Sequence, residues 1–409
     1  MTKNTAKTVE QMLPAELLAR FRERASVYDA ENRFFTEDFE ELAANGYLAA
    51  AVPESMGGSG LGLSELVRAQ RLLAAHAPAT ALGVNMHLVW VQVARFLHER
   101  GLGGDAFGSL DWVLREAVAG EVFAFGISEA GNEAVLMDSF SEAVPDTEGD
   151  GGYRVTGTKI FTTLSPVWTR LGVHALSTRP VEGAPDPHLV FGFVRREQAG
   201  ASADLGGGSI SHSGVWNPLG MRATQSWTTR LEGVRIAAAD VAARIEPLVG
   251  QHPLVLGVFS SFSLLTAAVY AGIADRALEL ATAAVNRPLP GEAGDAEAPA
   301  IRLDDPDTAS RLTAALLDHR ASLDVLELLA RDVDELRSRD DWPLALAAAR
   351  NRATDEARRA VDVAMRLVGA AGFQADSELA RLYRDVLAGM FHPSSSRALA
   401  ESVRRSLRA

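Results

Sequence analysis

Histidine is the side chain best suited to moving a proton near neutral pH, and two of the nine in this sequence are our candidates. His392 directly precedes Pro393 and the serine run 394–396, and His87 lies in the apolar stretch NMHLVW. An imidazole titrates near neutrality and can act as a general base. Either histidine could instead cap a helix or bond a backbone carbonyl. We take His392 as the leading catalytic candidate and His87 as the second.

The composition excludes several other kinds of chemistry. The 409 residues include no cysteine, so disulfides, thiolate catalysis and thiolate metal sites are excluded, and we predict no metal site. Forty basic and 53 acidic residues give a formal charge of -13, which opposes binding to a nucleic-acid backbone. Residues 1–10 are polar, unlike a signal peptide, and no apolar run reaches the about 18 residues of a membrane span. We expect a cytoplasmic protein that acts on a small molecule.

Three segments must position the candidate residues. Apolar spacings of three and four predict helices up to about Ala119, interrupted by a Gly-rich loop at Ala51–Leu63. Short apolar runs divided by Gly, Pro and Asp then predict strands at Phe123–Ile127, Gly152–Thr156, Thr169–Leu176, Leu189–Val194 and Thr228–Val234. The helical pattern returns at Leu254–Val285, Thr308–Leu336 and Leu344–Ala370.

This order predicts an α+β fold with an N-terminal helical domain (1–120), a central β domain (121–240) and a C-terminal helical bundle (241–409). The helical halves should pack together with the sheet beside them. Ligand pockets tend to form in the cleft between such unlike domains.

Five segments together resemble the acyl-CoA dehydrogenase superfamily of flavoproteins. They are AVPESMGGSGLG at Ala51, FGISEAGN at Phe125, GTKIFTT at Gly157, LGMRATQS at Leu219 and LYRDVLAG at Leu382. The resemblance covers nearly the whole chain. It implies a C-terminal four-helix bundle and an FAD that lies extended between the β domain and that bundle.

The resemblance also implies which residues bind the flavin ring. Phe125, Ile127 and Ser128 match the strand whose backbone and hydroxyl meet the ring, where N–H groups stabilise the charge of reduced flavin. Phe161 stands where the family usually places a Trp against the flavin, and an aromatic ring can replace it by stacking. Thr163 matches a hydroxyl donor near N5.

Two further matches concern a neighbouring subunit. Arg287 matches an Arg that reaches the FAD pyrophosphate across a dimer interface, and a guanidinium is a natural bidentate partner for phosphate. Gly369 opens the turn GAAGF, which resembles a turn that approaches the neighbour's cofactor. The resemblance therefore implies a homodimer or homotetramer. Pro290 and Arg366 depart from the family's usual Phe and Gln nearby.

The residues that normally perform the family's chemistry are missing. The usual catalytic Glu is replaced by Pro393. The alternative Glu aligns with Phe262 or its neighbours, in a stretch, Phe259–Tyr270, without Asp or Glu. Ser260 and Ser263 occupy the places of the Asp and Arg that bind CoA. Glu129 remains, but the resemblance gives it a structural role in its loop.

Several functions follow from this pattern. The first is an FAD-dependent oxidoreductase of the acyl-CoA dehydrogenase type, oxidising an acyl thioester of CoA or a carrier protein, or a related small substrate. The second is a flavin-dependent monooxygenase or oxidase on a substrate without CoA, because monooxygenases of this fold lack the Glu, often place a His near the flavin and use a partner reductase. The third is an inactive family member with a binding role. The substrate and the electron acceptor or reductase stay open.

Overall fold

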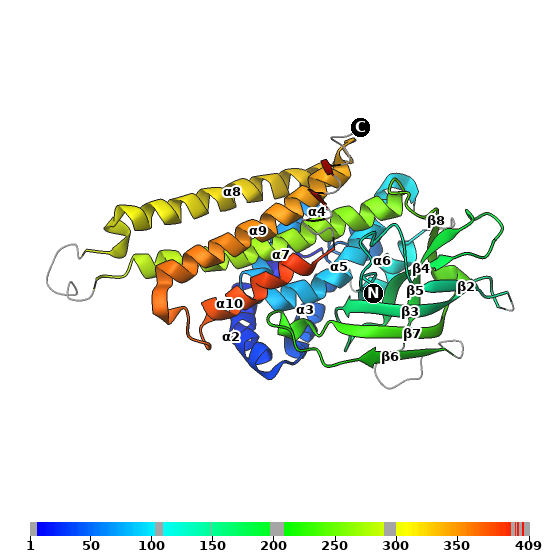
Figure 1. Cartoon of the computed structure of the whole chain (residues 1–409), viewed down its shortest axis with the longest axis horizontal. Helices are drawn as coiled ribbons and strands as arrows, with labels where there is room; N and C mark the ends of the chain where they lie inside the picture. The colour runs from blue at the N-terminus through cyan, green and yellow to red at the C-terminus, as the bar shows by residue number, and fades with distance from the viewer. Residues whose placement is uncertain are drawn as a thin grey trace.

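The computed structural model describes residues 6–102, 109–147, 149–196, 208–289, 300–393, 397, 399, 400, 403 and 404. The order of its elements confirms the predicted α+β fold (Figure 1). Helices form the first third of the chain, a mixed sheet follows, and long helices complete it. The N-terminal α-helices are α1 (Val9–Met12), α2 (Ala15–Glu31), α3 (Thr36–Ala44), α4 (Leu63–Ala74), α5 (Pro78–Leu97) and α6 (Asp111–Val118).

The central sheet has eight strands, in the order β6-β7-β3-β2-β4-β5-β8 with β1 pairing in parallel to β4. The strands are β1 (Phe123–Gly126), β2 (Glu142–Pro145), β3 (Tyr153–Thr162), β4 (Arg170–Ser177), β5 (His188–Arg195), β6 (Ser209–Ser213), β7 (Trp227–Ile236) and β8 (Val241–Ile245). Since β8 belongs to this sheet, the strands continue past the predicted domain boundary at residue 240.

The C-terminal α-helices are α7 (Pro253–Val285), α8 (Pro306–Asp334), α9 (Trp342–Val368) and α10 (Glu378–Val386), followed by the 3-10 turn η8 (Leu387–Phe391). In Figure 1 the helices α7, α8 and α9 lie side by side at one end of the molecule, and the sheet lies at the other. The predicted helical spans agree with α7, α8 and α9 to within about two residues, which is ordinary uncertainty at helix ends.

Helix α7 forms the centre of the fold. It has the length and apolar composition of a membrane-spanning helix, but 89% of its most apolar window is buried inside the protein. It packs against α4, α5, α8 and α9, so its apolar surface is covered by other helices. A helix that is hydrophobic all round is expected in such a core position.

Helix α5 connects the bundle with the sheet. Trp90 on α5 donates from Nε1 to the carbonyl oxygen of Ala124 in β1, at 3.0 Å. Gly172 in β4 allows this approach, because a Cβ at that position would collide with the Trp90 indole. The sheet end and the helical end are thus fixed to each other where β1 ends.

Candidate flavin and substrate site

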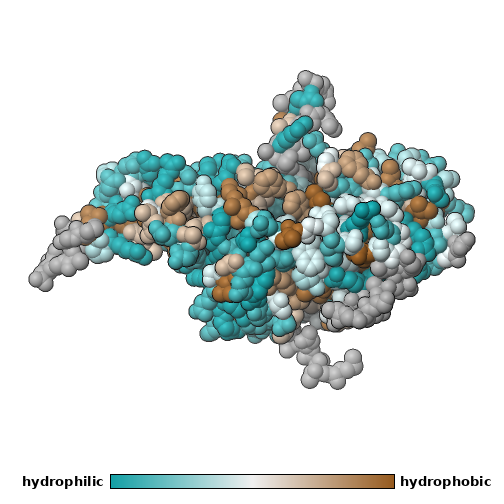
Figure 2. Space-filling view, turned by 60° about the horizontal axis from the view of Figure 1, so that its bottom comes forward, coloured by the Kyte–Doolittle hydropathy of each residue, from teal (hydrophilic) through white to brown (hydrophobic). Residues whose placement is uncertain are grey.

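The end of β1 meets α7 and the C-terminal turn in a row of rings. Phe125 stacks on Phe262 with centroids 5.6 Å apart, and Phe262 meets the His392 ring edge-on at 6.1 Å. The fold therefore brings the predicted flavin residue Phe125 and the predicted base His392 to one place, with Phe262 between them. On the face seen in Figure 2, the most hydrophobic surface gathers near the middle of the molecule, between its helical end and its sheet end.

A strained turn at the end of β3 places Phe161 at the surface of this region. Phe161 has a φ of 55° and is 48% exposed, which is unusual for a bulky residue. Strain of this kind concentrates at ligand sites. Its ring meets Trp216 edge-on at 6.2 Å, so an aromatic surface is held open to solvent.

Thr163 follows in the same turn and is already engaged. Its hydroxyl lies 2.7 Å from that of Ser226, which in turn lies 2.8 Å from that of Thr224. This chain of hydroxyls joins the end of β3 to the segment before β7. Thr163 can donate to a ligand only by turning its proton away from Ser226.

Ser128, which is predicted to meet the flavin ring, has a free hydroxyl. Its carbonyl accepts a bond from the Ile160 N–H at 2.9 Å, which fixes its backbone against β3, and the adjacent Ile127 is fully buried. Ser128 is partly exposed, and its hydroxyl makes no hydrogen bond to a described residue. A fixed backbone with a free donor suits a polar ring edge.

His392 is held by Tyr270 of α7. Its Nε2 lies 2.7 Å from the Tyr270 hydroxyl, and Gly389 in η8 permits this approach because a Cβ there would collide with Thr354 and touch the Tyr270 ring. His392 keeps part of its surface exposed, but desolvation of its ring, with a smaller contribution from the Arg350 guanidinium, lowers its pKa to about 3. The expectation that His392 titrates near neutrality does not fit this environment. The serines 394–396 lie outside the described residues.

His87 has no nitrogen left for a substrate. Its Nδ1 accepts from the backbone N–H of Phe123 at 3.0 Å, so its Nε2–H donates to the Leu48 carbonyl at 2.9 Å. It is fully buried, and burial lowers its pKa to about 4. We therefore give His87 a structural role, joining α5 to β1.

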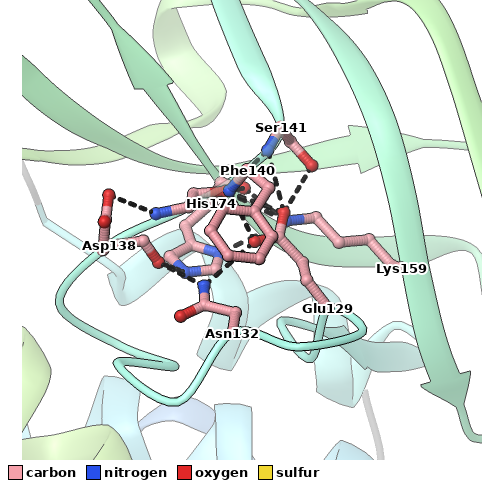
Figure 3. Close-up of polar contacts among 8 residues, drawn as sticks. Glu129, Asn132, Asp138, Phe140, Ser141, Lys159 and His174 are labelled. Carbon is pink, nitrogen blue, oxygen red and sulfur yellow. Dashed lines mark hydrogen bonds and ion pairs between the residues drawn. The ribbon is translucent and has the colours of Figure 1, made fainter.

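Glu129 fixes the loop that follows Ser128 (Figure 3). Its carboxylate accepts from the Lys159 ammonium at 2.7 Å and from the backbone N–H groups of Phe140 and Ser141 at 2.7 and 3.0 Å. Burial alone would raise the pKa of Glu129, but the Lys159 charge and these donors hold it well below its usual value. Glu129 is thus a buried structural carboxylate.

Arg287 and Gly369 lie at the opposite end of the bundle. Arg287 is exposed just after α7, and Gly369 ends α9 with a φ of 76° and open space around its Cα. Phe262 is 25 residues before Arg287 along α7, about 37 Å at 1.5 Å per residue. Neither residue can reach the flavin region of its own chain.

A separate groove of about 450 Å³ lies between α7 and α8, lined by Leu278, Thr282, Leu316 and the polar pair Asp275 and His319. It lies on the half of α7 beyond Phe262 and holds none of the predicted site residues. Within the described ranges, no cluster of three or more His, Asp or Glu residues could hold a metal ion.

Three residues of the site region escaped the sequence analysis: Tyr270, Trp216 and Ser226. Tyr270 had a visible signal, because it is the one aromatic hydroxyl of α7 and follows a stretch without charged residues. Ser226 also had one, as the last residue of the segment LGMRATQS, whereas Trp216 had none because it reaches the site only through the fold.

Comparison with known proteins shows which family the chain belongs to. Residues 3–100 match the family model of the acyl-CoA dehydrogenase N-terminal domain, and residues 264–397 match that of a C-terminal domain. The amino sugar nitrososynthase RubN8 of Streptomyces rubradiris is 30% identical over 394 residues, covering 91% of this chain and 83% of the relative. The chain belongs to the acyl-CoA dehydrogenase superfamily. It is thus a member of a family of flavin-dependent oxidoreductases.

Other superfamily members are similar along their whole length. The putative acyl-CoA dehydrogenase YdbM of Bacillus subtilis is 27% identical over 388 residues, covering 91% of this chain and 90% of the relative. KijD3, solved in complex with dTDP, superposes with a TM-score of 0.79 at 24% identity, covering 98% of this chain and 96% of KijD3. A second KijD3 structure, with a TM-score of 0.75 and coverage of 96% and 91%, contains FMN and an amino-keto sugar nucleotide.

Proposed function

We propose that this protein is a flavin-dependent monooxygenase that oxygenates a small substrate lacking CoA. The observation that carries this proposal is the replacement of both customary base positions. Pro393 stands at one, Phe262 stands at the other, and the adjacent His392 has Nε2 occupied by Tyr270. A dehydrogenase needs a base to remove the α-proton, whereas oxygen transfer to an electron-rich atom does not.

The residues present fit a flavin. When bound and reduced, a flavin supplies the electrons that activate dioxygen. Ser128 would donate to the polar edge of the ring, and the exposed Phe161 would cover a face by stacking. Phe125, Phe262 and the buried wall of α7 exclude water from the reacting side, which favours productive oxygen transfer over loss of the oxidant.

The similarity to the nitrososynthase RubN8 supports an amine nitrogen as the first substrate atom to test. The sequence prediction of acyl-thioester oxidation becomes the second candidate, favoured by the similarity to YdbM. FAD stays the predicted flavin.

Two measurements on one preparation separate the candidates. In the first, under anaerobic conditions, butyryl-CoA should not bleach the bound flavin. In the second, the flavin is reduced chemically and isotopically labelled dioxygen is added, and the labelled oxygen should appear in an amino sugar. Bleaching by the acyl-CoA would overturn the proposal in favour of the dehydrogenase. Failure of label transfer across a panel of amino sugars and other amines would remove the amine assignment.

A further inference from the structure

The bond between Tyr270 and His392 has a defined direction. The Tyr270 hydroxyl is completely buried, and His392 Nε2, at 2.7 Å, is the one acceptor recorded for it among the described residues. The nearby Arg350 guanidinium affects the pKa values of both partners, but it carries only donors and cannot take the phenolic proton. Because a buried hydroxyl donates when an acceptor is in reach, the Tyr270 proton points at Nε2.

A second pair in the same chain shows the same arrangement. In the β domain, Tyr153 lies 2.9 Å from His188 Nε2, and Arg244 donates to the Tyr153 oxygen at 2.6 Å. His188 Nδ1 lies 2.9 Å from the Pro185 carbonyl, which can only accept, so His188 must carry its proton on Nδ1. The direction deduced for the Tyr270 pair is therefore one that this protein also uses elsewhere.

A neutral imidazole that accepts at Nε2 carries its proton on Nδ1. We propose that Tyr270 is a positioning residue that fixes His392 as the Nδ1–H tautomer, so that His392 acts in the site as a hydrogen-bond donor and not as a base. This inference revises the role predicted for His392 from sequence. Its functional part rests on the proposed monooxygenase activity, and its structural part does not.

The environment explains why a donor is useful at this position. His392 Nδ1 makes no hydrogen bond to a described residue, and the His392 ring adjoins Phe262, which stacks on Phe125 at the end of β1. A donor of fixed direction in an apolar wall stabilises negative charge on a nearby oxygen more strongly than it would in water. The natural acceptor is an electron-rich oxygen on the substrate or at the flavin face.

The tautomer can be measured directly, without turnover. In nitrogen-15 spectra of histidine-labelled holoprotein at neutral pH, with His392→Asn identifying the signal, His392 should show a protonated Nδ1 and an unprotonated Nε2. Tyr270→Phe should move His392 toward the Nε2–H tautomer. Tyr153→Phe is the matched control. Tyr153 lies at the far end of β3, about 26 Å along the strand from Phe161 at the candidate site, so this variant should leave the His392 signal unchanged.

Activity variants test the donor role separately. His392→Asn keeps an N–H near the position of Nδ1, whereas His392→Asp offers only an acceptor. The kcat of the Asn variant should therefore be at least about 10-fold higher than that of the Asp variant, which corresponds to the contribution of one hydrogen bond. An Nε2–H or doubly protonated His392 in the wild type, or an Asp variant more active than the Asn variant, would overturn the inference. If the wild-type protein oxygenates none of the tested substrates, only the proposed function fails, because the spectra still determine the tautomer of His392.

Discussion

The Nδ1 atom of His319 lies 3.0 Å from a carboxylate oxygen of Glu356. Its Nε2 lies 2.8 Å from Asp275, so one imidazole of α8 joins α9 and α7. Both partners are carboxylates, which only accept, and both ring nitrogens must therefore be protonated. Burial lowers the pKa of His319, but the two carboxylates outweigh burial and raise it to about 9.

The pH dependence of stability should reflect this raised pKa. The unfolded pKa is about 6.5, so the contribution of His319 is fully present below that pH and is lost as the pH rises through about 9. A shift of this size corresponds to about 3 kcal/mol. The Tm should fall between these pH values, and His319→Gln should flatten the fall while His76→Gln should not. Equal slopes in all three proteins would contradict the assignment.

Removing the Lys159 ammonium should destabilise the β domain strongly. Lys159 is completely buried and is the one cation paired with Glu129 among the described residues, so Lys159→Met leaves a buried carboxylate without its counter-charge. Such a loss typically costs about 3–5 kcal/mol. Denaturant unfolding should show this loss, and the double variant Lys159→Met with Glu129→Gln should recover part of it. A double variant less stable than Lys159→Met would argue against an ion-pair origin.

Asp334 at the end of α8 caps the start of α4. Its carboxylate accepts from the backbone N–H groups of Leu63 at 2.6 Å and Ser64 at 2.9 Å. Asp334→Ala should cost about 1–2 kcal/mol, as for other N-terminal caps, and should speed hydrogen exchange of these two amides. Asp307→Ala serves as the control, since Asp307 is exposed and pairs with Arg311 on its own helix. Unchanged exchange at Leu63 and Ser64 would show that the cap contributes nothing.

Arg287 should decide which flavin is retained. If it meets the pyrophosphate of FAD in a neighbouring subunit, Arg287→Gln removes a charge-assisted bond worth about 1.5–3 kcal/mol, and the Kd for FAD should rise roughly 10- to 100-fold. The Kd for FMN, which has no pyrophosphate, should not change. Arg320→Gln on the exposed face of α8 is the control. Acid release and chromatography identify the flavin, and purification with FMN alone would remove the FAD prediction.

The assembly itself gives the fifth prediction. Because Arg287 cannot reach the flavin region of its own chain, a shared site requires at least two chains. Light scattering at micromolar concentration should give two or four times the 43.6 kDa of one chain. A monomeric mass in flavin-loaded protein would contradict the shared site.

The fold could be predicted because its main elements follow local patterns. Strands β4 and β5 are mostly apolar, since both of their faces are buried. Three strands were missed. Strand β8 is five residues long and lies beyond the predicted boundary at residue 240. The other two lack that signal: β6 is a polar edge strand, SISHS, and β2 is only four residues long and ends at Pro145. Their place in the sheet comes from pairing with β7 and β3.

The sequence predicted where the candidate site lies better than it predicted the protonation of its residues. The resemblance brought Phe125 and His392 to one region, and the row of rings through Phe262 agrees with that expectation. The ionisation of His392 could not be read from sequence, because it depends on burial and on Tyr270, which is 122 residues away in the chain. His87 shows the same limit, since its partners Leu48 and Phe123 come from separate segments.

The length of α7 has a consequence for handling the protein. With the predicted ring-binding residues near one end of this helix and Arg287 beyond the other, a shared flavin would be held by two chains at once. Dilution that separates the chains would then release the flavin by mass action. A pale, inactive preparation could in that case be an over-diluted one, and concentrating it with added flavin should restore its colour.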